Sequence, residues 1–396
     1  MDAENWRLGD PSMESKPRMQ VRLFKPSVGE NELANLRSVF ERAWLGLGPL
    51  VSQFENEWSA YIGAACSVGV NSATAALHLA LTAYGFPPGS KVLVPAITFV
   101  STATAALYNK LEPLFVDVDP RTLSLSFDDL ERKVTKDCVA VMPVHMGGHP
   151  VPMERLMEFA KIHHLAVIED CAHCAGGIYK GKRLGTWGDI GCYSFEEKKC
   201  MTTGDGGMLS SDNVDLLEPL RAYRWVGIDK DTWKRSTGYT NSKDLDARHW
   251  YYEVAVLGYK FNMNDVMAAI GLAQLKKLDH MNERRRVIIQ RYLDGIKGCR
   301  QLEPLLPYEL KEASYWLFGI RCKRREDLIL HLKQWGIASG VHFLPLPLHP
   351  LFKSHDEPIP IAKEIWQTML TLPLFADMAN EEVDYVIEAL REFDRL

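Results

Sequence analysis

The sequence of 396 residues has little that would tie it to a membrane or to a secretory route. It contains no apolar run of the roughly 20 residues that a helix needs to span a bilayer. A polar leader, residues 1–20, is mixed in charge and lacks the apolar core of roughly 7–15 residues that marks a secretory signal. We therefore expect neither a membrane association nor export.

The chain also has no excess of positive charge. Lysine and arginine number 46 against 51 aspartate and glutamate, which leaves a formal net charge of -5. Nucleic acids and anionic lipids are bound by clustered lysine and arginine side chains. Because the overall balance is acidic and gives no basic footprint, we discount both classes of partner.

Cysteine is sparse as well, with eight residues scattered along the chain. This usage is typical of a reduced compartment, and we expect a cytoplasmic protein without a disulfide scaffold. Cys171 and Cys174 form a C-x-x-C pair, but the second pair that a zinc site needs is missing. We predict two buried structural thiols there and no metal.

From Cys66 onward, short apolar runs alternate with stretches of helical periodicity. Strands are predicted at Cys66–Val70, Lys91–Pro95, Pro113–Val118, Cys138–Val144, Ala166–Glu169 and Asp189–Phe195. Helices are predicted at Ala73–Ala83, Ser101–Tyr108, Met153–His163 and Val214–Tyr223. This alternation predicts an α/β fold with a mostly parallel sheet, whose ligands bind beyond the carboxyl ends of the strands.

The flanks of this region divide the chain into a polar leader at 1–20, a large domain at 21–263 and a last part at 264–396. Two helices, Gly29–Trp44 and one that begins at Pro49, precede the first strand. Asn264 caps a helix that is apolar nearly all round, which indicates burial at a subunit interface or a domain junction. Beyond it, a strand (Tyr315–Arg321), a helix (Arg325–Gln334), a strand (Val341–Leu344) and an amphipathic helix (Glu381–Phe393) predict a smaller α+β domain. The polar connection 228–253 is long enough to favour a functional role.

Three features, together with a lysine, point to pyridoxal 5′-phosphate, which needs an amine anchor, a charge partner for its ring nitrogen and a phosphate cup. Asp170 ends an apolar strand, where a carboxylate can keep a pyridinium nitrogen protonated. Ser72 and Thr74 open a helix whose free amides can bind phosphate. Phe99 stands at a strand end, where its ring can stack on a flat cofactor.

Each feature also has a structural interpretation. A lone aspartate after a strand is often a helix N-cap, a helix that begins with hydroxyl residues is often only capped, and an isolated phenylalanine is usually core. The anchor lies in D-I-G-C-Y-S-F-E-E-K-K-C-M-T-T-G-D-G-G, residues 189–207, which holds the adjacent Lys198 and Lys199.

At this stretch the sequence resembles the DegT-type nucleotide-sugar aminotransferases, which have the aspartate-aminotransferase fold (fold type I) of pyridoxal-phosphate enzymes. Their pattern is Ser-Phe, three variable residues, the Schiff-base lysine, then Thr-x-Gly-Glu-Gly-Gly. Ser194, Phe195 and Thr203 to Gly207 match it, with Asp205 in place of glutamate. The resemblance puts the Schiff base on Lys199 and makes Lys198 a variable residue. It extends from Pro26 to Leu278 and returns in G-I-A-S-G-V-H-F-L-P-L-P-L-H-P.

The resemblance also implies roles for the other residues. Asp170 would pair with the pyridine nitrogen, His173 would lie near the cofactor ring, and Phe99 would stack on it. Ala73 and Thr74 match the first phosphate-binding element and Ser194 the second. Many members have G-Y-N-Y-R in a loop that reaches the phosphate of the neighbouring subunit, where this chain has G-Y-K-F-N. The contact therefore falls to Lys260 or Asn262, and His342 resembles a residue at the substrate end of the pocket.

The activity implied is a ping-pong transamination in amino-sugar biosynthesis, carried out by a homodimer. Glutamate would donate the amino group, and a nucleotide-linked 4-keto or 3-keto deoxysugar would accept it. Competing hypotheses are a ketocyclitol acceptor, a sugar 3-dehydratase and a non-catalytic ligand-binding regulator. The dehydratase branch has histidine at the position of Lys199, and a regulator would be expected to lose the lysine or to add a DNA-binding segment.

Overall fold

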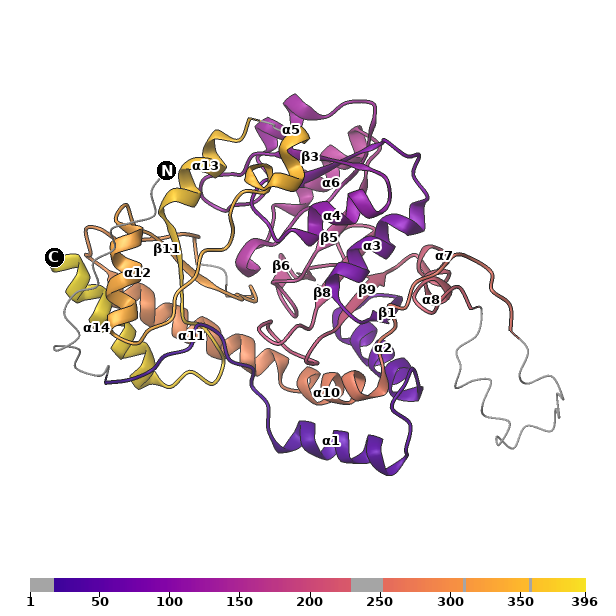
Figure 1. Ribbon diagram of the computed structural model, residues 1–396, viewed down its shortest axis with the longest axis horizontal. Helices are drawn as coiled ribbons and strands as arrows, with labels where there is room; N and C mark the ends of the chain where they lie inside the picture. Colours follow the sequence, from indigo (N-terminus) through magenta and orange to yellow (C-terminus); the bar gives the residue numbers. More distant parts are fainter. Residues whose placement is uncertain (1–17, 229–251, 309–310, 356–357) are drawn as a thin grey trace, which may run out of the picture.

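A seven-stranded sheet forms the centre of the computed structural model, which describes residues 18–228, 252–308, 311–355 and 358–396. Its strands are β1 (Cys66–Val70), β2 (Lys91–Pro95), β3 (Glu112–Val116), β4 (Cys138–Val141), β5 (Ala166–Asp170), β8 (Ile190–Ser194) and β9 (Gly207–Ser211). They lie in the order β1-β9-β8-β5-β4-β2-β3 (Figure 1). The predicted α/β fold is confirmed, and the expected bounds of β1 and β2 are correct to the residue.

The strand β9 was not predicted from the sequence. It begins with glycine and ends with two buried serines, so its apolar run is only Met208 and Leu209. It pairs antiparallel with both β1 and β8, whereas the strands from β8 to β3 are parallel to one another. In this register Gly207 lies opposite Val70 on one side and Ser194 on the other. The antiparallel strand thus brings the ends of β1 and β8 to one edge of the sheet.

Helices cover both faces of this sheet, because successive residues of a buried strand point to opposite sides. Val92 and Val94 of β2 join the core beneath α3, and Leu93 between them joins the core beneath α6. The helices of this part are α1 (Glu30–Glu41), α2 (Pro49–Ile62), α3 (Ala73–Tyr84), α4 (Ser101–Tyr108), α5 (Phe127–Lys133), α6 (Met153–Ile162), α7 (Val214–Leu217) and α8 (Leu220–Tyr223). A small hairpin of β6 (Ile178–Tyr179) and β7 (Lys182–Arg183) lies apart from the sheet.

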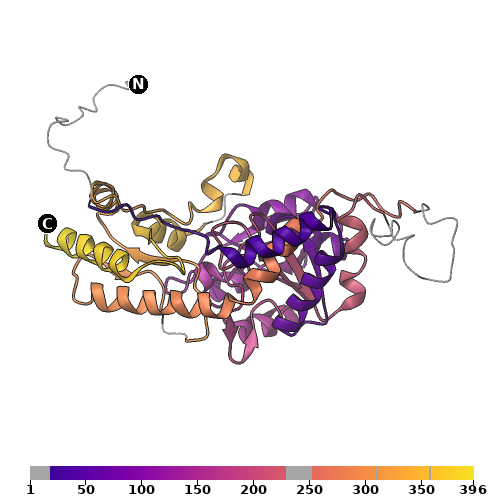
Figure 2. The same ribbon diagram turned by 90° about the horizontal axis from the view of Figure 1, so that it is seen from below.

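Two long helices lead from this sheet to a second one. They are α10 (Asp265–Leu275), capped by the Asn264 side chain as predicted, and α11 (Leu278–Ile296). The second sheet is antiparallel and contains β10 (Glu303–Pro304), β11 (Phe318–Arg321) and β12 (Met369–Leu372). The helices α12 (Arg325–Gln334), α13 (Pro360–Thr368) and α14 (Asn380–Arg395) accompany it, and α14 lies beside α11 (Figure 2). The boundary expected at residue 264 stays a prediction.

The structure corrects two predicted elements. Val341–Leu344 is not a strand, since only Gly340 before it forms a bridge, to Thr371. The expected helix Val214–Tyr223 is interrupted after Leu217, because Pro219 supplies no amide to continue it. The polar leader lies almost wholly outside the described residues, as does most of the connection 228–253. In the described part of the chain, no helix has the length and apolar character to cross a membrane.

The helix α10 packs against α1 and α2 of its own chain. This packing buries most of the helix, as its sequence predicts, but Val266, Met267 and Ile270 stay partly exposed. Two hydrogen bonds anchor its N-terminal turn. The Asn264 side chain accepts one from the Met267 amide, and the Asp265 side chain accepts one from the Val51 amide at 3.1 Å. The helix is therefore held rigidly below the sheet (Figure 1).

Candidate active site

A pocket of about 700 Å³ opens at the carboxyl ends of the parallel strands. Eight of the residues predicted from the sequence line it: Ala73, Thr74, Phe99, Asp170, His173, Ser194, Lys199 and His342. Lining residues that the sequence did not single out include Arg22, Phe24, Ser101, Glu196, Trp316 and Phe343. The sheet topology explains this convergence, since parallel strands place their carboxyl ends on one edge.

Lys199 lies in a tight turn between β8 and β9. Its backbone amide donates to the Glu196 carbonyl at 3.0 Å, and the Thr203 amide closes the turn on the Phe195 carbonyl at 2.9 Å. Burial lowers the pKa of Lys199 to about 8, although Glu196 and Asp170 act in the opposite direction. Lowering the pKa in this way makes a larger fraction of the amine neutral near neutral pH than in an ordinary lysine, and the neutral amine is the nucleophilic form. Lys198, by contrast, is exposed.

Asp170 ends β5 with its side chain almost fully buried. Its Oδ2 accepts a hydrogen bond from the Thr102 hydroxyl at 2.8 Å, and its Oδ1 accepts one from the Ala172 amide at 3.1 Å. Burial nevertheless raises the pKa of Asp170, because it outweighs these hydrogen bonds and the positive charge of Lys199. The ionised form of a buried carboxylate is stabilised by a nearby cation, and a protonated pyridine nitrogen is such a cation. A role as a helix N-cap, the structural interpretation of Asp170, would not explain why its side chain lines the pocket.

His173 is a second buried group that requires a partner. It is 2% exposed, and neither of its ring nitrogens has a hydrogen-bond partner among the described residues. Burial, reinforced by the charge of Lys199, holds its pKa well below the usual value. A neutral imidazole therefore presents one donor and one acceptor to the pocket. Because an unsatisfied buried polar group is unfavourable, this arrangement fits a polar ligand such as the cofactor ring.

The third part of the pocket is a cup for an anion at the start of α3. Ser72 caps this helix by accepting a hydrogen bond from the Ala75 amide at 3.1 Å, and the amides that precede Ala75 in the first turn have no intrahelical acceptor. The hydroxyls of Thr74 and Ser101 lie 2.7 Å apart beside them. Gly207 permits this closeness, because a Cβ there would lie 2.5 Å from the Ser72 carbonyl carbon. Amides and hydroxyls gathered at a helix start fit a phosphate.

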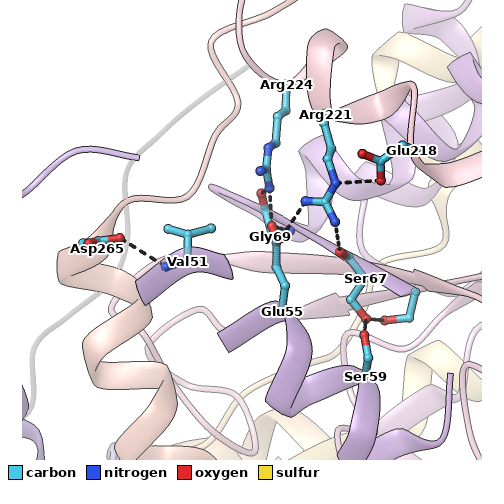
Figure 3. A network of polar contacts seen from close by, with 10 residues as sticks. Val51, Glu55, Ser59, Ser67, Gly69, Glu218, Arg221, Arg224 and Asp265 are labelled. Atoms are coloured by element: carbon cyan, nitrogen blue, oxygen red, sulfur yellow. Dashed lines mark hydrogen bonds and ion pairs between the residues drawn. The ribbon is translucent and has the colours of Figure 1, made fainter. Parts of the chain in front are cut away.

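A buried ionic network supports the strand that leads into this cup (Figure 3). Glu55 of α2 accepts a hydrogen bond from the Gly69 amide of β1 at 2.8 Å and one from Arg221 at 2.6 Å, and it also pairs with Arg224. Burial alone would raise the pKa of Glu55, but the two arginines outweigh it and hold this pKa low. Arg224 in turn donates to the Gly69 carbonyl at 2.7 Å. The network fixes β1 just before the phosphate cup, and local sequence patterns gave no sign of it.

The rim of the pocket is aromatic. Phe99 is 52% exposed and tilts against Phe343 at 5.8 Å between ring centroids, so one side of its ring is open to a ligand. His342 is held by a 2.9 Å hydrogen bond between its Nδ1 and the Thr371 hydroxyl. Burial, helped by the charges of Lys199 and Lys198, lowers the pKa of His342 to about 4. His342 is thus a neutral hydrogen-bonding group at the pocket wall.

Two predicted residues lie away from the pocket of their own chain. The Lys260 ammonium lies 3.2 Å from the centroid of the Trp225 ring, and the Asn262 side chain donates to the Met263 carbonyl at 3.0 Å. Their segment is fixed beside the cup, since the Asn71 amide donates to the Phe261 carbonyl at 2.7 Å. A contact with the neighbouring subunit stays a prediction for both.

Cys171 and Cys174 are free and buried, as expected. Their sulfur atoms and a ring nitrogen of His145 lie within 4.8 Å of one another. Both nitrogens of that imidazole are engaged, one with the Val151 amide at 3.2 Å and one with Glu169 at 3.0 Å. Burial raises the pKa of both thiols and so favours their protonated form, as in structural cysteines.

The fold and the pocket together define a pyridoxal-phosphate enzyme of the aspartate-aminotransferase class. The chain belongs to the DegT/DnrJ/EryC1/StrS aminotransferase family, whose model matches residues 26–391. It is 36% identical to the spore coat polysaccharide biosynthesis protein SpsC of Bacillus subtilis, over 93% of this chain and 95% of that protein. It is 33% identical to GDP-perosamine synthase of Escherichia coli O157:H7, over 94% and 98% of the two chains.

Solved structures agree with this assignment. The aminotransferase TlmJ from Streptoalloteichus hindustanus is 31% identical, with a TM-score of 0.86 over 94% of this chain and 98% of that one. The putative sugar aminotransferase Spr1654 from Streptococcus pneumoniae, in its PMP form, is 27% identical with a TM-score of 0.86 over 95% and 98%. The protein is therefore a pyridoxal-phosphate-dependent sugar aminotransferase, which takes an amino donor and a sugar acceptor. The dehydratase and regulator hypotheses are not favoured.

Proposed function

We propose that this enzyme transfers an amino group from glutamate to a nucleotide-linked 4-keto or 3-keto deoxysugar. The observation that carries the nucleotide link is the side chain of Arg22 at the pocket mouth. It is exposed, lines the pocket and has no ion-pair or hydrogen-bond partner in the described part of the chain. Lys198 adds a second exposed cation to the lining. Unpaired cations at a mouth of this kind favour an anionic ligand such as a diphosphate.

Lys199 and Asp170 are the residues to which we assign the chemistry. When bound, the cofactor supplies an electron sink for the carbon that loses or gains the proton. Lys199 would hold the cofactor between turnovers and, once released by the amino donor, act as the general base. Its low pKa supports this role, since a neutral amine is needed to accept a proton. Asp170 would keep the ring nitrogen protonated, and Ala73, Thr74 and Ser194 would bind the phosphate.

Two further properties belong to the same proposal. We infer a homodimer in which Lys260 or Asn262 of each subunit reaches the other active site. The apolar residues left exposed near this loop, Val254 at 66% and Leu257 at 90%, support such an interface. We also assign the enzyme to the cytoplasm, in keeping with its eight free cysteines.

A substrate panel tests the acceptor. The protein is first converted to its amino form with glutamate, and keto sugars with and without a nucleotide, and ketocyclitols, are then added while the cofactor absorbance is followed. Rapid return of the aldehyde form is expected only with nucleotide-linked keto sugars. A faster return with ketocyclitols would replace the proposed acceptor, and failure of glutamate in the first step would replace the donor. A molar mass corresponding only to monomer at micromolar concentration would contradict the homodimer.

A further inference from the structure

We propose that Trp316 is a positioning residue for the catalytic lysine, holding both the amine and the backbone of Lys199 through two different parts of its indole ring. The inference rests on the role proposed above for Lys199. Trp316 is 4% exposed and lies just before β11, on a segment of the chain remote in sequence from β8. The segment that leads into the second sheet thus contributes Trp316 to the pocket lining.

The first contact involves the face of the indole. The Lys199 ammonium nitrogen lies 4.0 Å from the centroid of the Trp316 ring. At this distance the ring quadrupole attracts a cation, and the attraction is stronger where water is excluded. The contact restricts a long, flexible side chain that would otherwise have several rotamers to occupy. It also favours the ammonium form and thereby opposes the effect of burial.

The second contact involves the edge of the indole. Its Nε1–H donates a 2.7 Å hydrogen bond to the carbonyl of Lys198, which belongs to the peptide group that links Lys198 to Lys199. The two residues are 118 positions apart, so this is a tertiary contact and not part of the turn itself. One side chain therefore fixes both ends of Lys199.

Trp316 is itself held firmly. Its backbone amide donates to the Gly147 carbonyl at 2.9 Å, and a Cβ on Gly148 would lie 1.9 Å from the Ser314 carbonyl oxygen. Its ring stacks on His173 at 4.1 Å between centroids with 14° between planes, and on Phe24 at 5.1 Å with 4°. The indole thus has little freedom, which is what a positioning residue requires.

Two substitutions separate the two contacts. Trp316→Phe keeps a ring face and loses the N–H donor, whereas Trp316→Leu loses both. Trp335→Phe is the matched control, because Trp335 packs against Tyr385 in the second part of the chain and does not line the pocket. All variants are made in the full-length chain, and each is first compared with the wild type by thermal unfolding.

The first measurement is the pH dependence of amine methylation in the full-length protein stripped of cofactor, followed at Lys199 by mass spectrometry. The exposed Lys198 on the same peptide serves as internal reference. In Trp316→Leu, the midpoint of the Lys199 methylation curve is expected at least about 0.5 pH unit below that of the wild type, since the ammonium loses its ring partner. In Trp316→Phe and Trp335→Phe, Lys199 is expected to show the same midpoint as in the wild type. A leucine variant that titrates at the same or a higher pH would overturn the role of the ring face.

The second measurement is amide hydrogen exchange across residues 195–204. Loss of the hydrogen bond to the Lys198 carbonyl is expected to speed exchange about fivefold in Trp316→Phe, and not in Trp335→Phe. Unchanged exchange in Trp316→Phe would overturn the backbone role, even if Trp316→Leu fails to fold.

In the cofactor-loaded enzyme, kcat should fall at least tenfold in Trp316→Leu while the acceptor KM stays within twofold. If the wild type aminates no keto sugar, the proposed function fails, while the methylation and exchange experiments still decide the role of Trp316.

Discussion

The hydroxyl of Thr102 donates a 2.8 Å hydrogen bond to Oδ2 of Asp170, and Thr102 is itself 2.9 Å from the Thr98 hydroxyl. Thr102 lies in the first turn of α4 and Thr98 lies just before this helix, so the start of α4 orients the carboxylate that ends β5. The Ala172 amide holds the other oxygen. The carboxylate of Asp170 is thus fixed in direction before any ligand arrives.

Asp170→Asn is expected to lower kcat at least roughly a hundredfold while some cofactor remains bound, because an amide cannot keep the ring nitrogen charged. Thr102→Val is the milder comparison and should lower kcat less, since the charge stays and only its orientation is loosened. Steady-state kinetics together with cofactor content check both variants. Normal turnover in the asparagine variant would remove Asp170 from this role.

Lys199→Ala is expected to abolish the visible absorbance band of the bound cofactor, because the other lysine that lines the pocket among the described residues, Lys198, is exposed. Lys198→Ala is the matched control, because Lys198 is the preceding residue and its side chain is exposed. This variant should retain the band. Absorbance spectra of the two purified variants with added cofactor are sufficient. If Lys198→Ala loses the band and Lys199→Ala retains it, the assignment of the cofactor-binding lysine is wrong by one residue.

Local patterns in the sequence predicted those features that short segments determine. The apolar runs of β1 and β2 and the Asn264 cap of α10 are examples. Features set by tertiary pairing were missed: β9 is buried by its neighbours in spite of its serines, and Val341–Leu344 is apolar except for His342 but pairs with no strand of the described chain.

The same distinction holds for the pocket. The residues expected at strand ends and helix starts do converge, because topology alone brings those positions together. Trp316 and Arg22 come from segments whose approach to the pocket depends on how the second sheet and the N-terminal segment pack. Val21, for example, forms a bridge with Ile337 that places Arg22 at the mouth. No periodicity in the sequence encodes such a contact.

His342 is expected to make the cofactor-free protein sensitive to acid. Its pKa in the folded state is lowered to about 4, below the value near 6.5 of an unfolded chain. Its contribution to the free energy of unfolding is therefore complete above about pH 6.5 and is lost as the pH falls toward 4, up to about 3 kcal/mol. Urea unfolding of the wild type and His342→Gln between pH 7 and pH 4.5 tests this. The wild type should lose more stability over this range, whereas His280→Gln, at an exposed position on α11, should follow the wild type.

Gly207→Ala is expected to weaken cofactor binding at least tenfold and to lower the stability of the protein. The added Cβ would lie 2.5 Å from the Ser72 carbonyl group and 2.7 Å from the Ala73 nitrogen, so β9 and the start of α3 would have to move apart. Overpacking of this kind typically costs about 1–3 kcal/mol. Gly46→Ala is the control, since a Cβ there meets nothing within 4 Å. Cofactor titration and thermal unfolding of both variants give the comparison, and equal affinities would show that the cup does not need this close approach.

Arg22→Gln is expected to raise the KM for a nucleotide-linked keto sugar about tenfold and to leave the KM for glutamate unchanged, because a charge-assisted contact to phosphate is lost. The difference from the wild type should shrink as salt is added, as it does for exposed charges. Lys25→Gln removes a positive charge from the same N-terminal segment, at an exposed position outside the pocket lining, and should change neither constant. With a keto sugar that lacks a nucleotide, wild type and Arg22→Gln should have equal KM values. A raised KM for glutamate alone would instead assign Arg22 to the carboxylate of the donor, and the nucleotide link would lose the observation that carries it.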